Sequence, residues 1–257
     1  MKELTDLEKI DLFFKYCKEL SENTPELVFN FSTYYKFYTY LVNLCDANKF
    51  PQVIEDKEFE ALNSTKLYRG VVDIEHHANL LSDYDYHYGY GMYGGGGLYM
   101  SDDRIQAMRY TRRNPENILT LKFEGKVIDE KELGFCLDYL EYSIKGEKYE
   151  IEKLKIKIAN SQDEQLIKLL IDYYKQLKTD KDKELFETIF IKQYSNLALI
   201  LGYDAMCYTY NEILIVLNRG KLIISKSEFE RVTSQSKNYQ GGLINFDTKA
   251  ENEFLME

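Results

Sequence analysis

The stretch Gly94-Gly95-Gly96-Gly97-Leu98-Tyr99-Met100-Ser101 decides how this chain is organised, because four glycines lead directly into a short apolar run. Glycine accepts positive φ and lets backbone approach a neighbour closely, so we expect a turn followed by a strand at 98–100. No Gly-Lys-Ser/Thr follows, which excludes a P-loop. The glycines precede a strand and do not follow one, which excludes a dinucleotide fingerprint. A flexible hairpin turn and a close approach to a ligand both remain open.

Outward from this stretch, the periodicity of apolar residues predicts an α+β fold, with helices first and short strands later. Thr5 and Glu8 have the spacing of a capping box at the start of the first helix. Residues 131–200 return to helical periodicity. The expected elements are helices over 5–20, 26–46 and 101–110, strands at 66–72, 98–100, 117–127, 205–208, 212–217 and 222–224, and a loop through 73–97.

Composition limits the classes of function. The formal net charge is −10, with 43 acidic and 33 basic residues, so general nucleic-acid binding is not expected. Arg104, Arg109, Arg112 and Arg113 could form a local basic patch, although a solvated helix end is the simpler interpretation. The four cysteines are far apart and have no ligand-spaced partner, so we expect neither a zinc site nor a disulfide framework.

Targeting signals give two further expectations. The charged start Met1-Lys2-Glu3 lacks the apolar segment of a secretory signal, and no apolar run approaches the roughly 20 residues of a membrane span. We therefore expect no membrane association. The protein is expected to be cytoplasmic, or delivered into a host cytoplasm by a route without a Sec signal peptide.

Two charged residues stand on apolar runs, where an unpaired charge is costly. Arg69 interrupts Leu67–Val72, and its planar fork suits a pyrophosphate, a carboxylate or an internal salt bridge. Glu212 opens the most apolar strand of the chain and could hold a ribose hydroxyl or stabilise a developing cation. A solvated strand start is the alternative for Glu212.

Tyr99 and Tyr110 bracket the predicted helix that follows the glycines. Two rings at this spacing could face one cleft and hold a flat cationic ring between them. The alternative is that both are core residues in a chain of 23 tyrosines. His76, His77 and His87 lie in the expected loop; their spacing defines no metal site, and a surface loop that could close over a ligand is the preferred interpretation.

Taken together, these motifs resemble the ADP-ribosyltransferase superfamily. Leu67-Tyr68-Arg69-Gly70, then Gly97–Ser101 with Tyr110, then Tyr210-Asn211-Glu212 before an apolar strand are similar to its three-part signature. The tyrosine spacing and the Tyr-Asn-Glu run resemble the branch of diphtheria toxin and the poly(ADP-ribose) polymerases. Arginine in the first motif and the trailing Ser101 resemble the arginine–serine–glutamate toxins. The motifs cover under a third of the chain.

The resemblance implies a fold, a co-substrate and a set of roles. The fold would be a split, mostly antiparallel β-sandwich with N-terminal helices and a helical insertion. NAD would be the co-substrate, with no metal. Glu212, Arg69 and Tyr99 would be catalytic. The residues implied to bind NAD are Arg69, Gly70, Gly97, Tyr99, Ser101 and Tyr110, with the two tyrosines around nicotinamide.

The same resemblance implies the activity and its limits. We expect a mono-ADP-ribosyltransferase, acting as a bacterial or phage effector or toxin on an unknown acceptor, most simply a protein. Tyr210 stands where arginine-modifying members carry glutamate, so arginine is not claimed as the acceptor. An NAD glycohydrolase and a catalytically inactive module that binds NAD or ADP-ribose are the alternatives.

The implied domain organisation has three parts. Residues 1–60 would be a helical region packed on the catalytic core. Residues 61–234 would form the catalytic domain, with the insertion at about 131–200. Residues 235–257 would be a polar tail.

Overall fold

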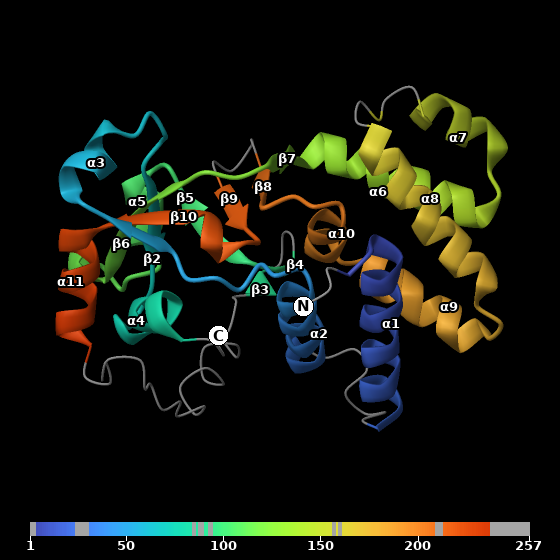
Figure 1. Cartoon of the computed structure of the whole chain (residues 1–257), viewed down its shortest axis with the longest axis horizontal. Coiled ribbons are helices and arrows are strands. Elements are labelled where there is room, and N and C mark those ends of the chain that lie inside the picture. Colours follow the sequence, from blue (N-terminus) through green and yellow to red (C-terminus); the bar gives the residue numbers. More distant parts are fainter. Residues whose placement is uncertain are drawn as a thin grey trace.

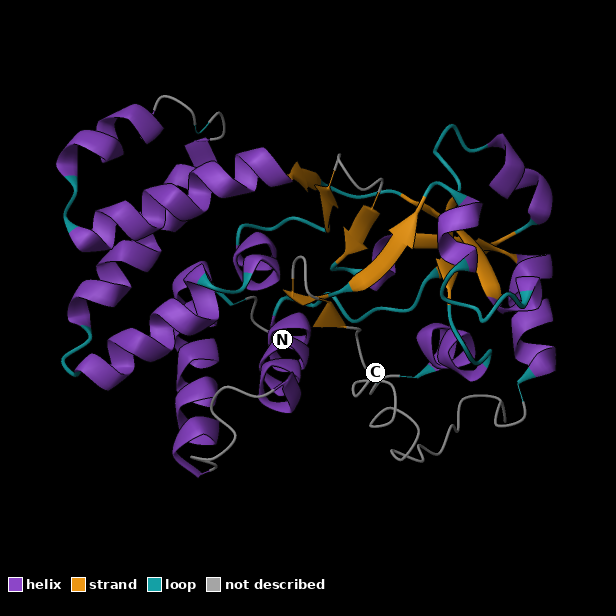
Figure 2. Ribbon diagram, turned by 180° about the vertical axis from the view of Figure 1, so that it is seen from behind, coloured by secondary structure: helices purple, strands orange, loops and turns teal. Residues whose placement is uncertain are grey.

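The computed structural model describes residues 4–23, 31–83, 86, 90–91, 95–155, 158, 161–208 and 213–236. The protein combines an open, multistranded sheet at one end with a group of helices at the other, as Figures 1 and 2 show from opposite sides. The described buried apolar side chains form one continuous core that runs through both ends. The expected α+β class is therefore confirmed.

The strands that the structure describes form one sheet of eight and one separate pair. The order in the large sheet is β1-β10-β6-β2-β5-β9-β8-β7. Its pairings are antiparallel except β1 with β10 and β7 with β8, which are parallel. The strands of this sheet are β1 (Gln52–Ile54), β2 (Leu67–Gly70), β5 (Leu98–Ser101), β6 (Ile118–Phe123), β7 (Val127–Asp129), β8 (Ala205–Tyr208), β9 (Ile213–Val216) and β10 (Leu222–Ser225).

The helical end joins the first helix to the 131–200 region. Phe13 meets Phe190 edge-on with ring centroids 5.6 Å apart, and Phe14 meets Tyr173 at 5.5 Å. These contacts bury part of the apolar stripe of the first helix against helices far along the chain. The elements here are α1 (Asp6–Asn23), α6 (Glu130–Lys145), α7 (Lys148–Lys155), α8 (Ser161–Gln176), α9 (Asp180–Phe186) and a π-helical turn (Glu187–Ile191).

Two helices and the small strand pair lie between the two ends (Figure 1). The helices are α2 (Phe31–Leu44) and α10 (Tyr194–Ile200), and the strands are β3 (Tyr90–Gly91) and β4 (Gly95–Gly96). The backbone N–H of Gly96 donates to Ser195 Oγ at 3.1 Å. A Cβ at Gly96 would lie 2.3 Å from a ring carbon of the buried Tyr38, so glycine is required for α2 to pack here.

Four short helices surround the large sheet: α3 (Asp56–Ala61), α4 (Glu75–Ser82), α5 (Arg104–Met108) and α11 (Lys226–Gln235). α5 contacts β2 and β5, whereas α4 contacts α11. The Nζ of Lys122, on β6, is buried and donates to the carbonyls of Phe59 and Leu62 at 2.7 Å each, which fixes the end of α3 to the sheet.

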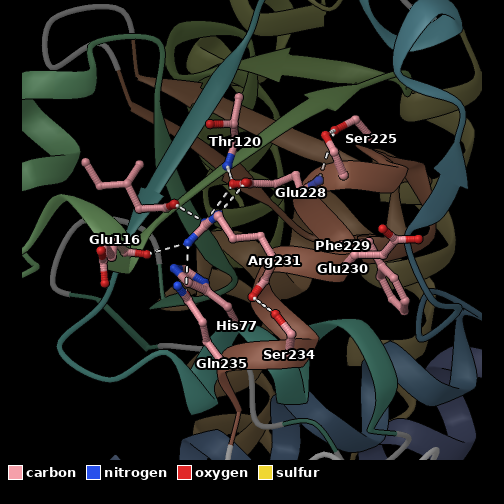
Figure 3. A network of polar contacts seen from close by, with 12 residues as sticks. His77, Glu116, Thr120, Ser225, Glu228, Phe229, Glu230, Arg231, Ser234 and Gln235 are labelled. Carbon is pink, nitrogen blue, oxygen red and sulfur yellow. Dashed lines mark hydrogen bonds and ion pairs between the residues drawn. The ribbon is translucent and has the colours of Figure 1, made fainter.

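α11 completes the edge of β6 beyond its short pairing with β10 (Figure 3). Glu228 Oε1 accepts from the backbone N–H of Thr120 at 2.9 Å, and Arg231 Nη2 donates to the carbonyl of Ile118 at 2.8 Å. Arg231 and Glu228 also form an ion pair, with Arg231 Nε 2.6 Å from Glu228 Oε2. A helix thus supplies hydrogen bonds that a neighbouring strand would otherwise make.

Several expected elements are confirmed and two are corrected. The capping box forms, with Thr5 N donating to Glu8 Oε2 at 2.7 Å. The expected single strand over 117–127 is wrong, because the chain leaves the sheet after Phe123 and returns in β7. The expected loop over 73–97 is also wrong in part, since residues 75–82 form α4. β1, α3 and α11 were not predicted.

Residues just before residue 60 pack on the large sheet. β1 pairs with β10, and α3 packs beside it, so residues 52–61 lie with the large sheet. No described helix has both the length and the apolar composition needed to cross a membrane.

Candidate functional site

Two of the three predicted motifs lie on strands that pair side by side, and the third leads into the next strand. β2 pairs with β5 through Tyr68 opposite Ser101, and β5 pairs with β9 through Ser101 opposite Ile213. Arg69 follows Tyr68 on β2. Glu212 immediately precedes Ile213 in sequence, but Tyr210, Asn211 and Glu212 lie outside the described residues. The described part of the site therefore comprises β2, β5 and the start of β9.

The side chains on β2 point alternately to the two faces of the sheet. Gly70 faces α5, because a Cβ built on it would lie 1.9 Å from the carbonyl oxygen of Ala107. Arg69 faces the opposite side, where it contacts α4. Register and alternation place Tyr99 and Ser101 on the same face as Gly70. The structure thus groups Gly70, Tyr99 and Ser101, and places Arg69 across the sheet from them.

The two predicted ligand-binding glycines have packing reasons to be glycine. At Gly70 the backbone of α5 occupies the space of a side chain. Gly97 has φ +148°, and a Cβ there would lie 2.4 Å from Ile215 Cγ2. These close approaches bring β2 against α5, and the entry to β5 against β9.

The two predicted tyrosines have different environments. Tyr99 is half-buried, and its hydroxyl donates to the carbonyl of Gly95 at 2.9 Å, which closes the glycine turn that precedes it. Tyr110 lies in the turn after α5, and 57% of it is exposed. The core alternative is therefore excluded for Tyr110. Ser101 is buried and its Oγ accepts from the backbone N–H of Asp103 at 3.0 Å.

Arg69 lies in a cluster that the sequence did not indicate. Its Nη1 lies 3.2 Å from His77 Nδ1, and its Nη2 donates to the hydroxyl of Tyr86 at 3.0 Å. His77 Nε2 lies 3.0 Å from the carbonyl oxygen of Asn117. Because that carbonyl can only accept, Nε2 carries the proton of His77 and Nδ1 accepts from Arg69. The cluster holds the guanidinium through two neutral groups.

Burial keeps His77 neutral. The side chain is fully buried on α4, and desolvation lowers its pKa well below the ordinary histidine value, with the Arg69 guanidinium acting in the same direction. A neutral imidazole can accept from Arg69, whereas a protonated one could not. The interpretation of His77 as a surface-loop residue is therefore wrong.

The guanidinium of Arg69 has no carboxylate partner among the residues that the structure describes. The internal salt bridge considered as an alternative is thus not formed within this part of the chain. Arg69 remains half-buried, so part of its charge faces solvent or a ligand. An arginine held in place by neutral acceptors keeps its affinity for an anion.

Arg219 supports the same cluster from the other end of α4. Its fully buried guanidinium donates to the carbonyls of Leu80 at 3.0 Å and Asp83 at 2.6 Å, at the C-terminus of that helix. It also lies over the Tyr86 ring, 5.4 Å from the centroid. Arg219 thereby joins α4, which carries His77, to Tyr86, the second partner of Arg69.

The sequence did contain a signal for α4. Asp73 precedes the helix and its Oδ1 accepts from the backbone N–H of Glu75 at 3.1 Å. His77, Ala78, Leu80 and Leu81 then have helical spacing and are all buried. The polar and aromatic residues that follow masked this short pattern.

Within the described ranges, no group of three or more metal-ligating side chains converges. Comparison of the chain with models of protein families, with curated proteins and with solved structures found no match.

Proposed function

We propose that this protein is an NAD-dependent mono-ADP-ribosyltransferase of the split-sandwich type. The observation that carries the proposal is the strand order β2-β5-β9, which puts the Arg69 motif, the Tyr99–Ser101 motif and the strand that follows Glu212 side by side. The three motifs are separated by about 30 and 110 residues in the sequence. The adjacency of β2, β5 and β9 is therefore a property of the fold and not of local sequence.

Arg69 would bind the anionic half of NAD, which would have to reach both faces of the sheet, because Arg69 lies on the opposite face from Tyr99. Its guanidinium is presented by His77 and Tyr86 without a described carboxylate to neutralise it, as a pyrophosphate site requires. Tyr110 is exposed in the turn after α5 and would stack on nicotinamide together with Tyr99.

In the proposed reaction the bond between the ribose anomeric carbon and the nicotinamide nitrogen breaks, and its electron pair leaves with nicotinamide. The ribose then carries the positive charge, which the Glu212 carboxylate would stabilise while it holds a ribose hydroxyl. A lone pair on the acceptor's oxygen or nitrogen forms the new bond to the anomeric carbon, and the acceptor loses its proton to solvent. The residues of the chain supply binding, orientation and charge.

The test is nicotinamide release from NAD by purified wild-type protein and by Glu212→Gln. We expect the substitution to reduce the rate by about 10²-fold or more, because an oriented charge that stabilises the transition state is removed. Glu184→Gln is the matched control, since Glu184 is an exposed glutamate on α9 at the helical end. The control should release nicotinamide at the wild-type rate.

The fate of ADP-ribose separates the remaining possibilities. A mass increment on a macromolecule after incubation with cell lysate would support transfer. Glutamate-dependent release without an adduct would assign the protein as an NAD glycohydrolase. No release by the wild type, with or without lysate, would refute the enzyme and leave a binding module.

A further inference from the structure

The segment from Arg104 to Arg113, formed by α5 and the turn after it, carries an unusual set of side chains. The chain has seven arginines and 26 lysines, which make up its 33 basic residues. Four of the seven arginines fall within these ten residues, and all four are exposed: Arg104, Arg109, Arg112 and Arg113. Arginine side chains are thus concentrated in one segment of a chain that is otherwise rich in lysine and has a net charge of −10.

The other three arginines all have fixed partners. Arg69 donates to Tyr86, Arg219 to backbone carbonyls of α4, and Arg231 to Glu228 and β6. Within the described chain, by contrast, the side chains of the four arginines at 104–113 have no hydrogen-bond or ion-pair partner. Their guanidinium groups are therefore available to a ligand.

The same segment exposes apolar surface. Ile105 is 74% exposed and Tyr110 is 57% exposed, the two highest values among the large apolar side chains that the structure describes. Ala107 and Thr111 form the buried side of the segment against the sheet. Two large apolar side chains thus project into solvent among the arginines.

The backbone of this turn is also strained. Arg112 has φ 49° and Arg113 has φ 66°, so two consecutive non-glycine residues occupy the left-handed region. Each such residue costs on the order of 1 kcal/mol, and such strain concentrates at functional segments. The strain accompanies a turn on which both side chains are exposed.

We propose that Arg104, Arg109, Arg112 and Arg113, together with Tyr110, bind single-stranded nucleic acid. The planar guanidinium matches phosphate geometry with two hydrogen bonds, which lysine cannot do. An exposed tyrosine between arginines provides the stacking surface on which an unpaired base lies in single-strand-binding proteins. An acidic peptide would satisfy the arginines, but only a nucleic acid carries a flat ring on every unit that could stack on Tyr110.

The acidic remainder of the protein is compatible with this surface. General binding along a phosphate backbone is disfavoured by the net charge of −10, so the contact is confined to one segment. Four phosphate contacts to a single strand correspond to a salt dependence with a slope of roughly −3 in log K against log salt. Because α5 packs on β2 and β5, a strand held here would lie beside Tyr99. If the proposed function holds, the nucleic acid is the acceptor, in place of the protein acceptor expected from sequence. Tyr110 would then stack on a base of the acceptor, and Tyr99 alone would stack on nicotinamide.

The test is fluorescence anisotropy of a labelled single-stranded oligonucleotide of mixed sequence, titrated with full-length protein at several salt concentrations. We expect Arg112→Gln with Arg113→Gln to weaken binding about tenfold or more and to reduce the salt slope by roughly 1.4. Tyr110→Leu should weaken binding about tenfold and leave the salt slope unchanged. Lys178→Gln with Lys181→Gln is the matched control, because it removes two exposed positive charges from the helical end and should bind as wild type.

Three results would overturn the nucleic-acid surface. These are no binding by a wild-type protein that releases nicotinamide, binding that the arginine substitutions leave unchanged, and equal displacement of the oligonucleotide by polyglutamate.

Displacement of the oligonucleotide by NAD, at concentrations near the affinity of the protein for NAD, would instead assign the arginines to NAD. Oligonucleotide binding that depends on these arginines in a protein that releases no nicotinamide would support the surface and refute the transferase. Circular dichroism melting of each variant distinguishes lost contacts from lost folding.

Discussion

His77 links the orientation of Arg69 to the protonation state of the folded protein. Its ring accepts from Arg69 only while Nδ1 is unprotonated, and burial on α4 lowers its pKa well below the usual value. The unfolded chain has a histidine pKa of about 6.5 and therefore binds a proton more readily than the folded chain does. Folding is thus most favourable when His77 is neutral in both states.

This linkage predicts a loss of stability in acid. As pH falls below about 6.5, the unfolded state gains a proton that the folded state does not, so the free energy of unfolding should decrease by up to about 1.4 kcal/mol per pH unit. Urea denaturation at pH 5, 6 and 7 measures this slope. His77→Gln should remove the contribution, because glutamine does not titrate.

The neighbouring His76 provides the control for this measurement. It lies on the same helix but is only half-buried, so His76→Gln should retain the acid-dependent loss of stability. If the free energy of unfolding changes equally with pH in wild type and His77→Gln, then His77 does not titrate differently in the folded and unfolded states.

At the scale of elements, α11 takes the place of a strand. β10 pairs with β6 only at Lys122 and Phe123, and the carboxylate and guanidinium of Glu228 and Arg231 bond the backbone of β6 before that point. A strand edge left without partners exposes backbone groups to other chains. Here the paired side chains of Glu228 and Arg231 form hydrogen bonds with the backbone groups of β6 that would otherwise lack partners at this edge.

Replacing Arg231 should therefore destabilise the sheet. We expect Arg231→Met to lower the free energy of unfolding by about 2 kcal/mol, because the Ile118 carbonyl and the Glu228 carboxylate both lose a charge-assisted partner. Arg104→Met removes an exposed arginine and should change stability by less than about 0.5 kcal/mol. Chemical denaturation of both variants makes the comparison, and similar losses would argue against the α11 contact.

At the scale of the whole molecule, a glycine joins the helical end to the sheet. Gly96 donates to Ser195 on α10 and lies against the Tyr38 ring on α2, so both helices pack onto the strand pair that precedes β5. The glycine run, for which a flexible turn and a close approach to a ligand were both open, thus has a definite packing role at Gly96. The close contact depends on the absence of a Cβ.

Gly96→Ala should consequently destabilise the protein by about 1–3 kcal/mol, since the buried Tyr38 ring has to move away from the new methyl group. Gly134→Ala on α6 is the matched substitution, with nothing within 4 Å of the added Cβ. It should stabilise the helix by about 0.5–1 kcal/mol. Thermal unfolding of the two variants should give shifts of opposite sign, and a neutral Gly96→Ala would contradict the contact.

Local sequence was sufficient to predict most elements. The capping box of Thr5 and Glu8, the helices of 131–200 and the strands β8, β9 and β10 follow from side-chain periodicity and from short-range hydrogen bonds. The sequence also indicated that Arg69 required a partner, because a charge on an apolar strand is costly, but it suggested an anionic one and not the neutral His77 and Tyr86. These inferences depend on neighbours a few residues apart.

Only the tertiary structure decided which elements meet. It placed β2, β5 and β9 side by side, buried His77 against Arg69, and put Arg69 on the opposite face from Tyr99. The partners of Arg69 and Arg219 come from segments up to 171 residues away. The turn after α5 exposes Tyr110 while burying Thr111. Periodicity records which side of an element is apolar, whereas the choice of partner depends on how all the apolar faces are buried together.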